Sequence, residues 1–181
     1  MKRLVLAVAF GSMSFAQAQV PPKEAIDITD ADVKSVLKNA PPAVDQQLRV
    51  VDMGKYNLAV GIIHRGKTRE GAPATGIFHA QETETYIIVS GGGTLITGGT
   101  IKNGREAPAD GEVVKVLNGP STSGAMEGYK ARKVGPGDII IIPFGVPHGW
   151  MDITDHVDYL SVRPDPDHVL PAGYVNPALK K

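Results

Sequence analysis

The chain has 181 residues, a formal net charge of zero and no cysteine. This length fits a single domain with its own core, and the absence of cysteine excludes a disulfide framework and a thiol nucleophile. No basic run or face suggests a phosphate backbone as a partner. We therefore expect neither nucleic acid nor, once the N-terminal segment is removed, a membrane as a partner.

The N-terminal segment has the order of a secretory signal peptide. Lys2 and Arg3 precede an apolar run over residues 4–15, and the small residues of "AQAQ" follow. The run is too short for a membrane-spanning helix, which needs about 20 residues. We expect residues 1–18 to be a signal peptide cleaved after Ala18, and the mature protein to be periplasmic or secreted.

Residues 19–50 are expected to form a linker and one short helix. In the stretch "ITDADVKSVLKNAPP", Thr29 fits an N-cap with Asp32 three residues later, and an apolar stripe follows. Pro41 then ends the helix. The helix is expected to cover one end or face of the main domain.

Residues 51–165 show no further helical periodicity, and short β-rich runs alternate with Gly, Pro and Asn. About ten such strands at this spacing predict an all-β sandwich or a small barrel, followed by a C-terminal tail over residues 166–181. The run "EVVKVL" (residues 112–117) counts among these strands. The four isoleucines of residues 139–142 lack alternation, so we expect both faces of that strand to be covered.

A turn over residues 143–147 follows the isoleucines, and His148 begins the next strand. With a period of two, His148 shares a face with Trp150 and Asp152. If this face is the inner one, the histidine lies at the mouth of the barrel on a stiff scaffold, which suits a metal ligand or a base.

A second polar cluster lies upstream in "TGIFHAQETETY". A reversal over residues 80–83 would place His79 directly across from Glu84 in an antiparallel pair, with Cβ atoms about 5 Å apart. Together with His148 they make a set of two histidines and one carboxylate. Such a set leaves open positions on a divalent metal and is typical of non-haem Fe(II) oxygen chemistry.

At these residues the sequence resembles the cupins. The second cupin motif, G-x5-P-x-G-x2-H-x3-N, is matched by Gly137, Pro143, Gly145 and His148, with Asp152 in place of the usual Asn. The resemblance covers roughly residues 56–163. It implies a double-stranded β-helix (jelly-roll) barrel, and pairing of barrels in the family makes a homodimer an expectation by analogy.

The first cupin motif, G-x5-H-x-H-x(3,4)-E-x6-G, is matched in part. His79, Glu84 and Gly91 fit the spacing, whereas Ile77 stands where the first histidine is expected. The resemblance implies one divalent metal per chain (Fe, Mn, Zn, Ni or Cu) held by His79, Glu84 and His148. In another register Gln81 would serve as a weak fourth ligand, although its separation from Glu84 is then too short for the motif.

These residues predict a metal-dependent cupin enzyme acting on a small organic molecule, either an oxygenase or an isomerase/lyase. Glu84 and His148 are the expected catalytic residues, together with His64 as a hydrogen-bond partner or proton carrier if it, rather than Arg65, faces inward. Three residues are expected to line the substrate pocket, namely Gln81, Tyr86 and Trp150. The alternatives are a non-catalytic module that binds a sugar or an aromatic compound through Tyr86 and Trp150, and a metal-free structural cupin.

Overall fold

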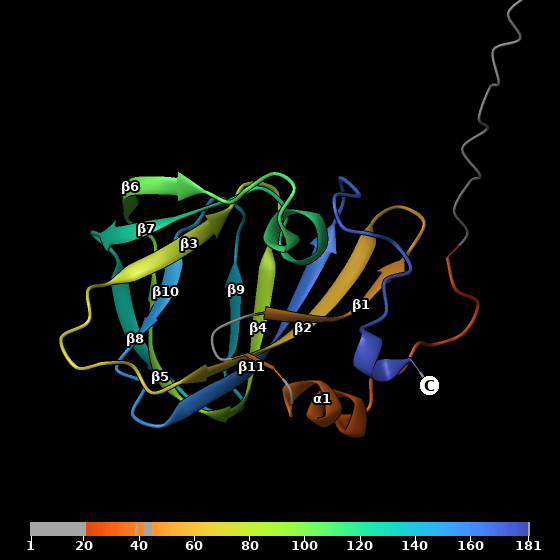
Figure 1. Ribbon diagram of the computed structural model, residues 1–181, viewed down its shortest axis with the longest axis horizontal. Helices are drawn as coiled ribbons and strands as arrows, with labels where there is room; N and C mark the ends of the chain where they lie inside the picture. Colours follow the sequence, from red (N-terminus) through yellow and green to blue (C-terminus); the bar gives the residue numbers. More distant parts are fainter. Residues whose placement is uncertain (1–20, 39, 42–44, 181) are drawn as a thin grey trace, which may run out of the picture.

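The computed structural model describes residues 21–38, 40–41 and 45–180. Over these residues, eleven strands form two antiparallel sheets that face each other as a barrel, and one α-helix lies against the outside (Figure 1). The predicted signal peptide lies outside the described residues. No helix in the described part of the chain is long and apolar enough to cross a membrane.

The first sheet has the strand order β1-β2-β11-β4-β9. Its strands are β1 (Asp45–Asp52), β2 (Asn57–Gly66), β11 (His156–Asp165), β4 (Glu84–Gly91) and β9 (Ile139–Ile142). The second sheet has the order β6-β7-β3-β10-β5-β8. Its strands are β6 (Thr100–Glu106), β7 (Ser121–Glu127), β3 (Thr75–His79), β10 (His148–Met151), β5 (Gly93–Thr97) and β8 (Lys130–Val134).

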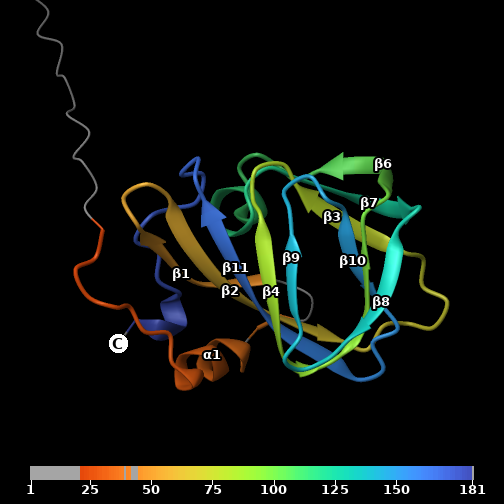
Figure 2. The same ribbon diagram turned by 180° about the vertical axis from the view of Figure 1, so that it is seen from behind.

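The connections make this barrel a jelly roll. The chain passes from β2 in the first sheet to β3 in the second, returns to the first sheet at β4, and crosses again at β5. It does the same from β8 through β9 and β10 to β11, which can be followed from behind in Figure 2. The predicted fold class, an all-β double-stranded β-helix of the cupin type with a short N-terminal helix, is confirmed.

The helix α1 (Asp30–Leu37) begins where the sequence predicts it. The Thr29 hydroxyl accepts a hydrogen bond from the Asp32 amide at 3.2 Å, and the Asp32 carboxylate accepts one from the Thr29 amide at 3.0 Å. This reciprocal pair is a capping box. Val36 of the helix packs against Ile62 of β2, on the outer face of the first sheet.

The main core lies between the two sheets. The two faces of strand β2 contribute to different clusters: Ile62 packs toward α1 on the outside, whereas its neighbour Ile63 points into the barrel. The interior cluster consists of Ile63, Tyr86, Ile88, Leu95, Val134, Ile140, Ile142, Ile153, Val157 and Tyr159. Side chains of alternating parity from both sheets therefore fill the interior, and the same parity decides which polar residues enter it.

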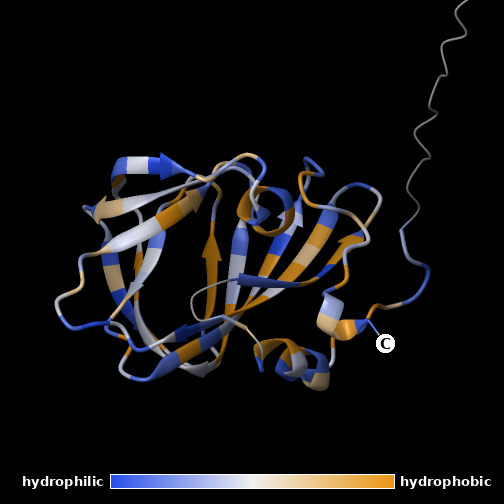
Figure 3. Cartoon of the chain, in the orientation of Figure 1, coloured by the Kyte–Doolittle hydropathy of each residue, from blue (hydrophilic) through white to orange (hydrophobic). Residues whose placement is uncertain are grey.

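The expectation that both faces of the isoleucine strand are covered is wrong. Ile140 and Ile142 are buried, whereas Ile139 and Ile141 are 64% and 71% exposed. Strand β9 is an edge strand of the first sheet, and Figure 3 shows it as hydrophobic along its length. Its outer face is apolar although no other described element lies on it.

The strand expected over residues 112–117 is also wrong. Residues Val113–Leu117 form a single π-helical turn, and a short 3-10 helix (Pro177–Leu179) lies near the end of the chain. The β-branched residues of "VVKVL" favour a strand, but local propensity yields to context where the chain folds over the end of the barrel between β6 and β7. This turn brings Leu117 and Asn118 to the polar cluster described next.

Candidate metal centre

His79, Glu84 and His148 come together in the interior of the barrel. Their ligand atoms all lie within 4.8 Å of one another, and all three residues are buried. His79 is the last residue of β3, Glu84 is the first of β4, and His148 is the first of β10. The three side chains predicted as ligands thus form a group that could hold a metal ion.

The predicted reason for the approach of His79 and Glu84 is wrong. They are not a cross-strand pair, because β3 belongs to the second sheet and β4 to the first. His79 is paired with Ser121 of β7, and Glu84 with Ile142 of β9. The segment of residues 80–83 crosses from one sheet to the other, so the imidazole and the carboxylate meet across the barrel interior.

Hydrogen bonds on the far side of each imidazole fix its tautomer. Nδ1 of His79 lies 2.7 Å from Oγ of Ser121, whose own proton goes to a backbone carbonyl at 2.8 Å. Nδ1 of His148 lies 3.0 Å from the carbonyl of Val146, which can only accept. Both Nδ1 atoms are therefore donors, and in the neutral imidazoles both Nε2 atoms carry the lone pair.

The two oxygens of Glu84 have different roles. Oε1 accepts hydrogen bonds from Arg163 Nε at 3.0 Å, Ser161 Oγ at 2.8 Å and Asn118 Nδ2 at 3.2 Å. Oε2 accepts one from the Tyr86 hydroxyl at 3.0 Å and faces both imidazole Nε2 atoms. The first oxygen is anchored by protein donors, and the second is presented to the histidines.

The contacts between the histidines and Glu84 have the form of an incomplete coordination site. Nε2 of His79 and Nε2 of His148 lie 3.3 Å and 3.1 Å from Glu84 Oε2. Despite this distance, His148 Nε2 is buried without a hydrogen bond of acceptable geometry. Asn118 Nδ2 lies 3.3 Å from His79 Nε2 and can donate to it, whereas His148 Nε2 and Glu84 Oε2 face each other as two acceptors. A cation between them would relieve this repulsion, and the donor set suits first-row divalent metals. The residues present therefore fit the metal that the sequence implies.

The ionisation states also fit. Burial alone would raise the pKa of Glu84, but the groups in contact with the carboxylate, among them the Arg163 guanidinium, outweigh it and hold that pKa well below its ordinary value. Burial lowers the pKa of His79, against the opposing effect of Glu84. An ionised carboxylate and a neutral imidazole are the forms that bind metal.

Arg163 supports Glu84 from a position that is 0% exposed. Its Nη1 donates to Gln47 Oε1 at 3.1 Å and to the Leu117 carbonyl at 3.0 Å, and its Nη2 is paired with Asp45. No sequence motif marks this arginine. Parity along β11, where alternate residues are buried, was a usable signal for it.

Two of the predicted pocket residues lie near the ligands. Tyr86 is buried, and its ring is nearly perpendicular to the His148 ring at a centroid distance of 5.9 Å. Trp150 is partly buried, packs its ring against Tyr159 at 5.3 Å, and lines a cavity together with His148. The expectation that His148 and Trp150 share an inner face agrees with this placement.

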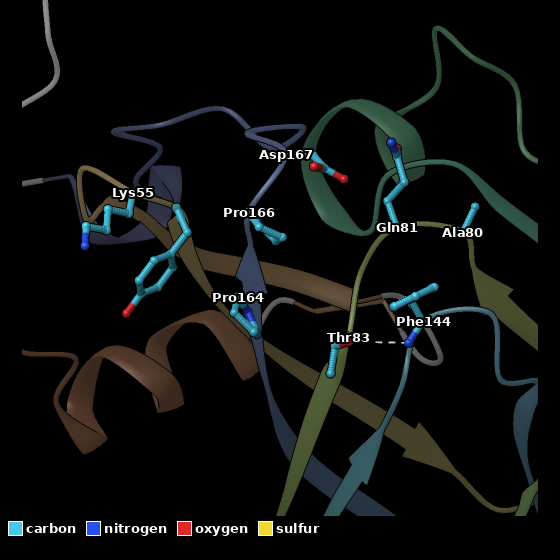
Figure 4. A pocket seen from close by; sticks show the side chains of 9 residues that line it. Lys55, Ala80, Gln81, Thr83, Phe144, Pro164, Pro166 and Asp167 are labelled. Atoms are coloured by element: carbon cyan, nitrogen blue, oxygen red, sulfur yellow. Dashed lines mark hydrogen bonds between the residues drawn. The ribbon is translucent and has the colours of Figure 1, made fainter.

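Gln81 lies elsewhere. It is exposed and lines a separate surface hollow of about 490 Å³ with Lys55, Phe144 and Asp167, as Figure 4 shows. It is thus neither a fourth ligand nor part of the cavity beside His148. The pocket position expected for Gln81 is wrong because residues 80–83 cross between the sheets, and Gln81 lies exposed on this crossing.

His64 is directed away from the cluster. It lies across from Asp158 on the outer face of the sheet, with Nδ1 2.6 Å from the Asp158 carboxylate. Its neighbour Arg65 lines the cavity beside His148. The geometry therefore does not support the catalytic role expected for His64, because parity along β2 turns Arg65 inward.

Ile77, which stands where the cupin motif has its first histidine, lies beside His148. It is the cross-strand partner of His148 in the β3–β10 pair, and it lines the same cavity. The three candidate ligands thus face an apolar side chain at residue 77.

No protein-family model and no curated protein matches the sequence. Solved structures similar to the chain include the BH2720 protein of Bacillus halodurans (15% identity, TM-score 0.47, 87% of this chain and 93% of that one). Others are an uncharacterised protein with a double-stranded β-helix domain from Klebsiella pneumoniae (18%, 0.41, 80% and 93%) and KdgF of Halomonas sp. (14%, 0.40, 70% and 84%). TM-scores below 0.5 carry nothing about activity, so the function has to be inferred from the side chains.

Proposed function

We propose that this protein is a cupin that holds one divalent transition metal through His79, Glu84 and His148 and acts on a small organic molecule. The observation that carries the proposal is the buried His148 Nε2, which faces Glu84 Oε2 at 3.1 Å without a hydrogen bond. When bound, such a metal supplies Lewis acidity or relays electrons, so the reaction is oxygenase-like or a metal-assisted isomerisation or elimination.

The residues around the ligands keep the donor set fixed. Ser121 and the Val146 carbonyl orient the two imidazoles, and Arg163 with Asn118 holds the far oxygen of Glu84. Outer contacts of this kind typically change metal affinity by about 10- to 100-fold when they are removed. Three protein ligands leave coordination positions for a substrate.

Tyr86 can hold a proton beside the site. Burial, followed by the charge of Glu84, raises the pKa of Tyr86 well above its ordinary value, so the phenol stays protonated at neutral pH. Its hydroxyl donates to Glu84 Oε2 at 3.0 Å. This proton is hydrogen-bonded to the oxygen that would face the metal, and it would serve an acid–base step at a bound substrate.

Metal content tests the proposal. Wild-type protein loaded with Fe(II), Mn(II) or Zn(II) and then desalted should retain one metal ion per chain by elemental analysis. His79→Ala, Glu84→Gln and His148→Ala should retain almost none, while His168→Ala, in a loop outside the cluster, should match the wild type. A wild-type chain that retains no metal, or a His148→Ala variant that retains it fully, would contradict the proposal.

The cellular location follows the sequence expectation and is part of the proposal. A signal peptide over residues 1–18 would place the enzyme in the periplasm or outside the cell. The intact mass of the chain recovered from a secreting host tests it: loss of residues 1–18 supports this location, and retention of the full chain contradicts it.

A further inference from the structure

A second feature of the barrel is a cavity of about 680 Å³ that reaches His148 from the end of β2. Its wall includes two cationic residues, Arg65 and Lys67. It also includes Thr75 and Ser123, whose hydroxyls form no hydrogen bond with another described residue. No Asp or Glu is found among the described residues that line it. The wall therefore carries positive charge without a built-in counter-ion.

Arg65 is held in place through its Nε, while its two Nη groups have no partner among the described residues. Its Nε donates to the Tyr159 hydroxyl at 2.8 Å, and Tyr159 packs on Tyr86, whose hydroxyl contacts Glu84. No described residue forms a hydrogen bond or ion pair with the two Nη groups of Arg65. A partly buried guanidinium with free Nη donors is matched by a carboxylate, which it can bind through two parallel hydrogen bonds.

Another part of the cavity wall is apolar. Ile77, Trp150 and Ile153 supply its non-polar wall, and His148 contributes the metal ligand. A molecule with one carboxylate and a planar or compact apolar body would match both parts. Inorganic phosphate, by contrast, would leave this apolar wall without a partner.

We propose that the substrate is a small organic carboxylate, whose carboxylate group is bound by Arg65, with Lys67 at the rim, and whose body lies against Trp150 next to His148. The proposal rests on the proposed function, because it names the substrate class of the same metal site. Arg65 is assigned as the residue that determines this specificity.

Trp150 offers a direct measurement, since it is the one tryptophan of the chain and lines the cavity. Benzoate is the probe, benzamide its uncharged counterpart, and quenching of Trp150 fluorescence gives the dissociation constant of each. Wild-type protein should bind benzoate, and Arg65→Met should weaken binding by about 10- to 100-fold, the range for a hydrogen-bonded ionic contact. Arg105→Met, on the exposed strand β6, is the matched control and should bind as the wild type.

Equal affinities for benzoate and benzamide, an Arg65→Met variant that binds as the wild type, or tighter binding of phosphate than of benzoate would each overturn the proposal. If Arg65→Met fails to fold, Arg65→Lys and the benzoate–benzamide comparison on wild-type protein decide. Each titration is run on metal-loaded and on EDTA-treated protein. Loss of benzoate binding with the metal content intact concerns Arg65, whereas absence of metal from the wild type concerns the proposed function.

Discussion

Arg163 donates its Nε–H to Oε1 of Glu84 at 3.0 Å from a fully buried position in β11. It occupies the oxygen that is not presented to the histidines, so it fixes the carboxylate without competing for the metal-facing oxygen. Asp45 and Gln47 of β1 hold the other end of the guanidinium. Through Arg163 of β11, the Glu84 carboxylate of β4 is thereby linked to β1 of the same sheet.

Replacing Arg163 should damage both stability and metal binding. Arg163→Met leaves the Glu84 and Asp45 carboxylates buried without their cation, which typically costs about 3–5 kcal/mol. We expect a lower midpoint in urea unfolding and loss of metal from the folded fraction. Arg105→Met, an exposed site, should change neither. A midpoint for Arg163→Met equal to that of the wild type would show that the buried network is not needed.

Ser121 should affect the affinity for the metal although it is not one of the candidate ligands. Its hydroxyl accepts from His79 Nδ1 and thereby keeps the lone pair of Nε2 directed at the site. Ser121→Ala should weaken metal binding by about 10- to 100-fold in a chelator competition. Ser90→Ala removes a hydroxyl that bonds His156 and Asp158 outside the cluster, and serves as the control. Equal losses in both variants would argue against a role in orienting His79.

The three candidate ligands could be singled out because their signals are local. The turn before His148 and the spacing from His79 to Glu84 lie within short stretches of sequence, and they match known motifs. The supporting residues are not local in this sense: Arg163 and its partner Asp45 are 118 residues apart. Asn118 follows a segment whose residues favour a strand, so no pattern placed it at the site.

The isoleucine strand shows a second limit of prediction from sequence patterns. A run of four isoleucines is compatible with cover on both faces, and periodicity cannot tell whether the strand is at an edge. Sheet order decides it, because β9 has a neighbour only in β4. The same global arrangement placed His79 and Glu84 in different sheets, although their approach was predicted from a hairpin.

Replacing Gly61 with alanine should lower the stability of the fold. A Cβ at this position would lie 2.7 Å from Asp45 Oδ1 and 3.2 Å from Arg163 Nη1. Gly61→Ala should therefore crowd the ion pair and lower stability by about 1–3 kcal/mol, as overpacking does. Gly66→Ala, in the same strand, meets nothing within 4 Å and is the control. Identical thermal unfolding of the two variants would contradict the crowding.

Glu82 should make stability depend on pH. Its side chain is 1% exposed and neither oxygen has a hydrogen-bond partner among the described residues. Burial, then the nearby Asp165, raises its pKa from 4.5 to about 8. The folded state therefore binds this proton more tightly than the unfolded state, and the stability it provides is full below about pH 4.5 and lost as the pH rises through about 8.

Glu82→Gln removes that ionisation. Since each tenfold change in proton affinity is worth roughly 1.4 kcal/mol, the variant should gain a few kcal/mol over the wild type between pH 5 and pH 9. Urea unfolding at both values measures the gain. Exposed Glu106→Gln is the control. A stability difference between Glu82→Gln and the wild type that stays constant with pH would show that the carboxyl is already ionised in the folded protein.

Ile77→His should supply the fourth ligand. Ile77 is the cross-strand partner of His148, and side chains opposed in an antiparallel pair share a face with Cβ atoms about 5 Å apart. An imidazole at this position can thus reach the region where His148 Nε2 points. We expect metal affinity to rise by about tenfold or more, equivalent to roughly 1.4 kcal/mol, in competition with a chelator. Ile141→His, on the exposed outer face of β9, should leave the affinity unchanged. If Ile77→His binds metal no better than Ile141→His, then residue 77 does not face the metal, and the cavity wall opposite His148 serves the substrate alone.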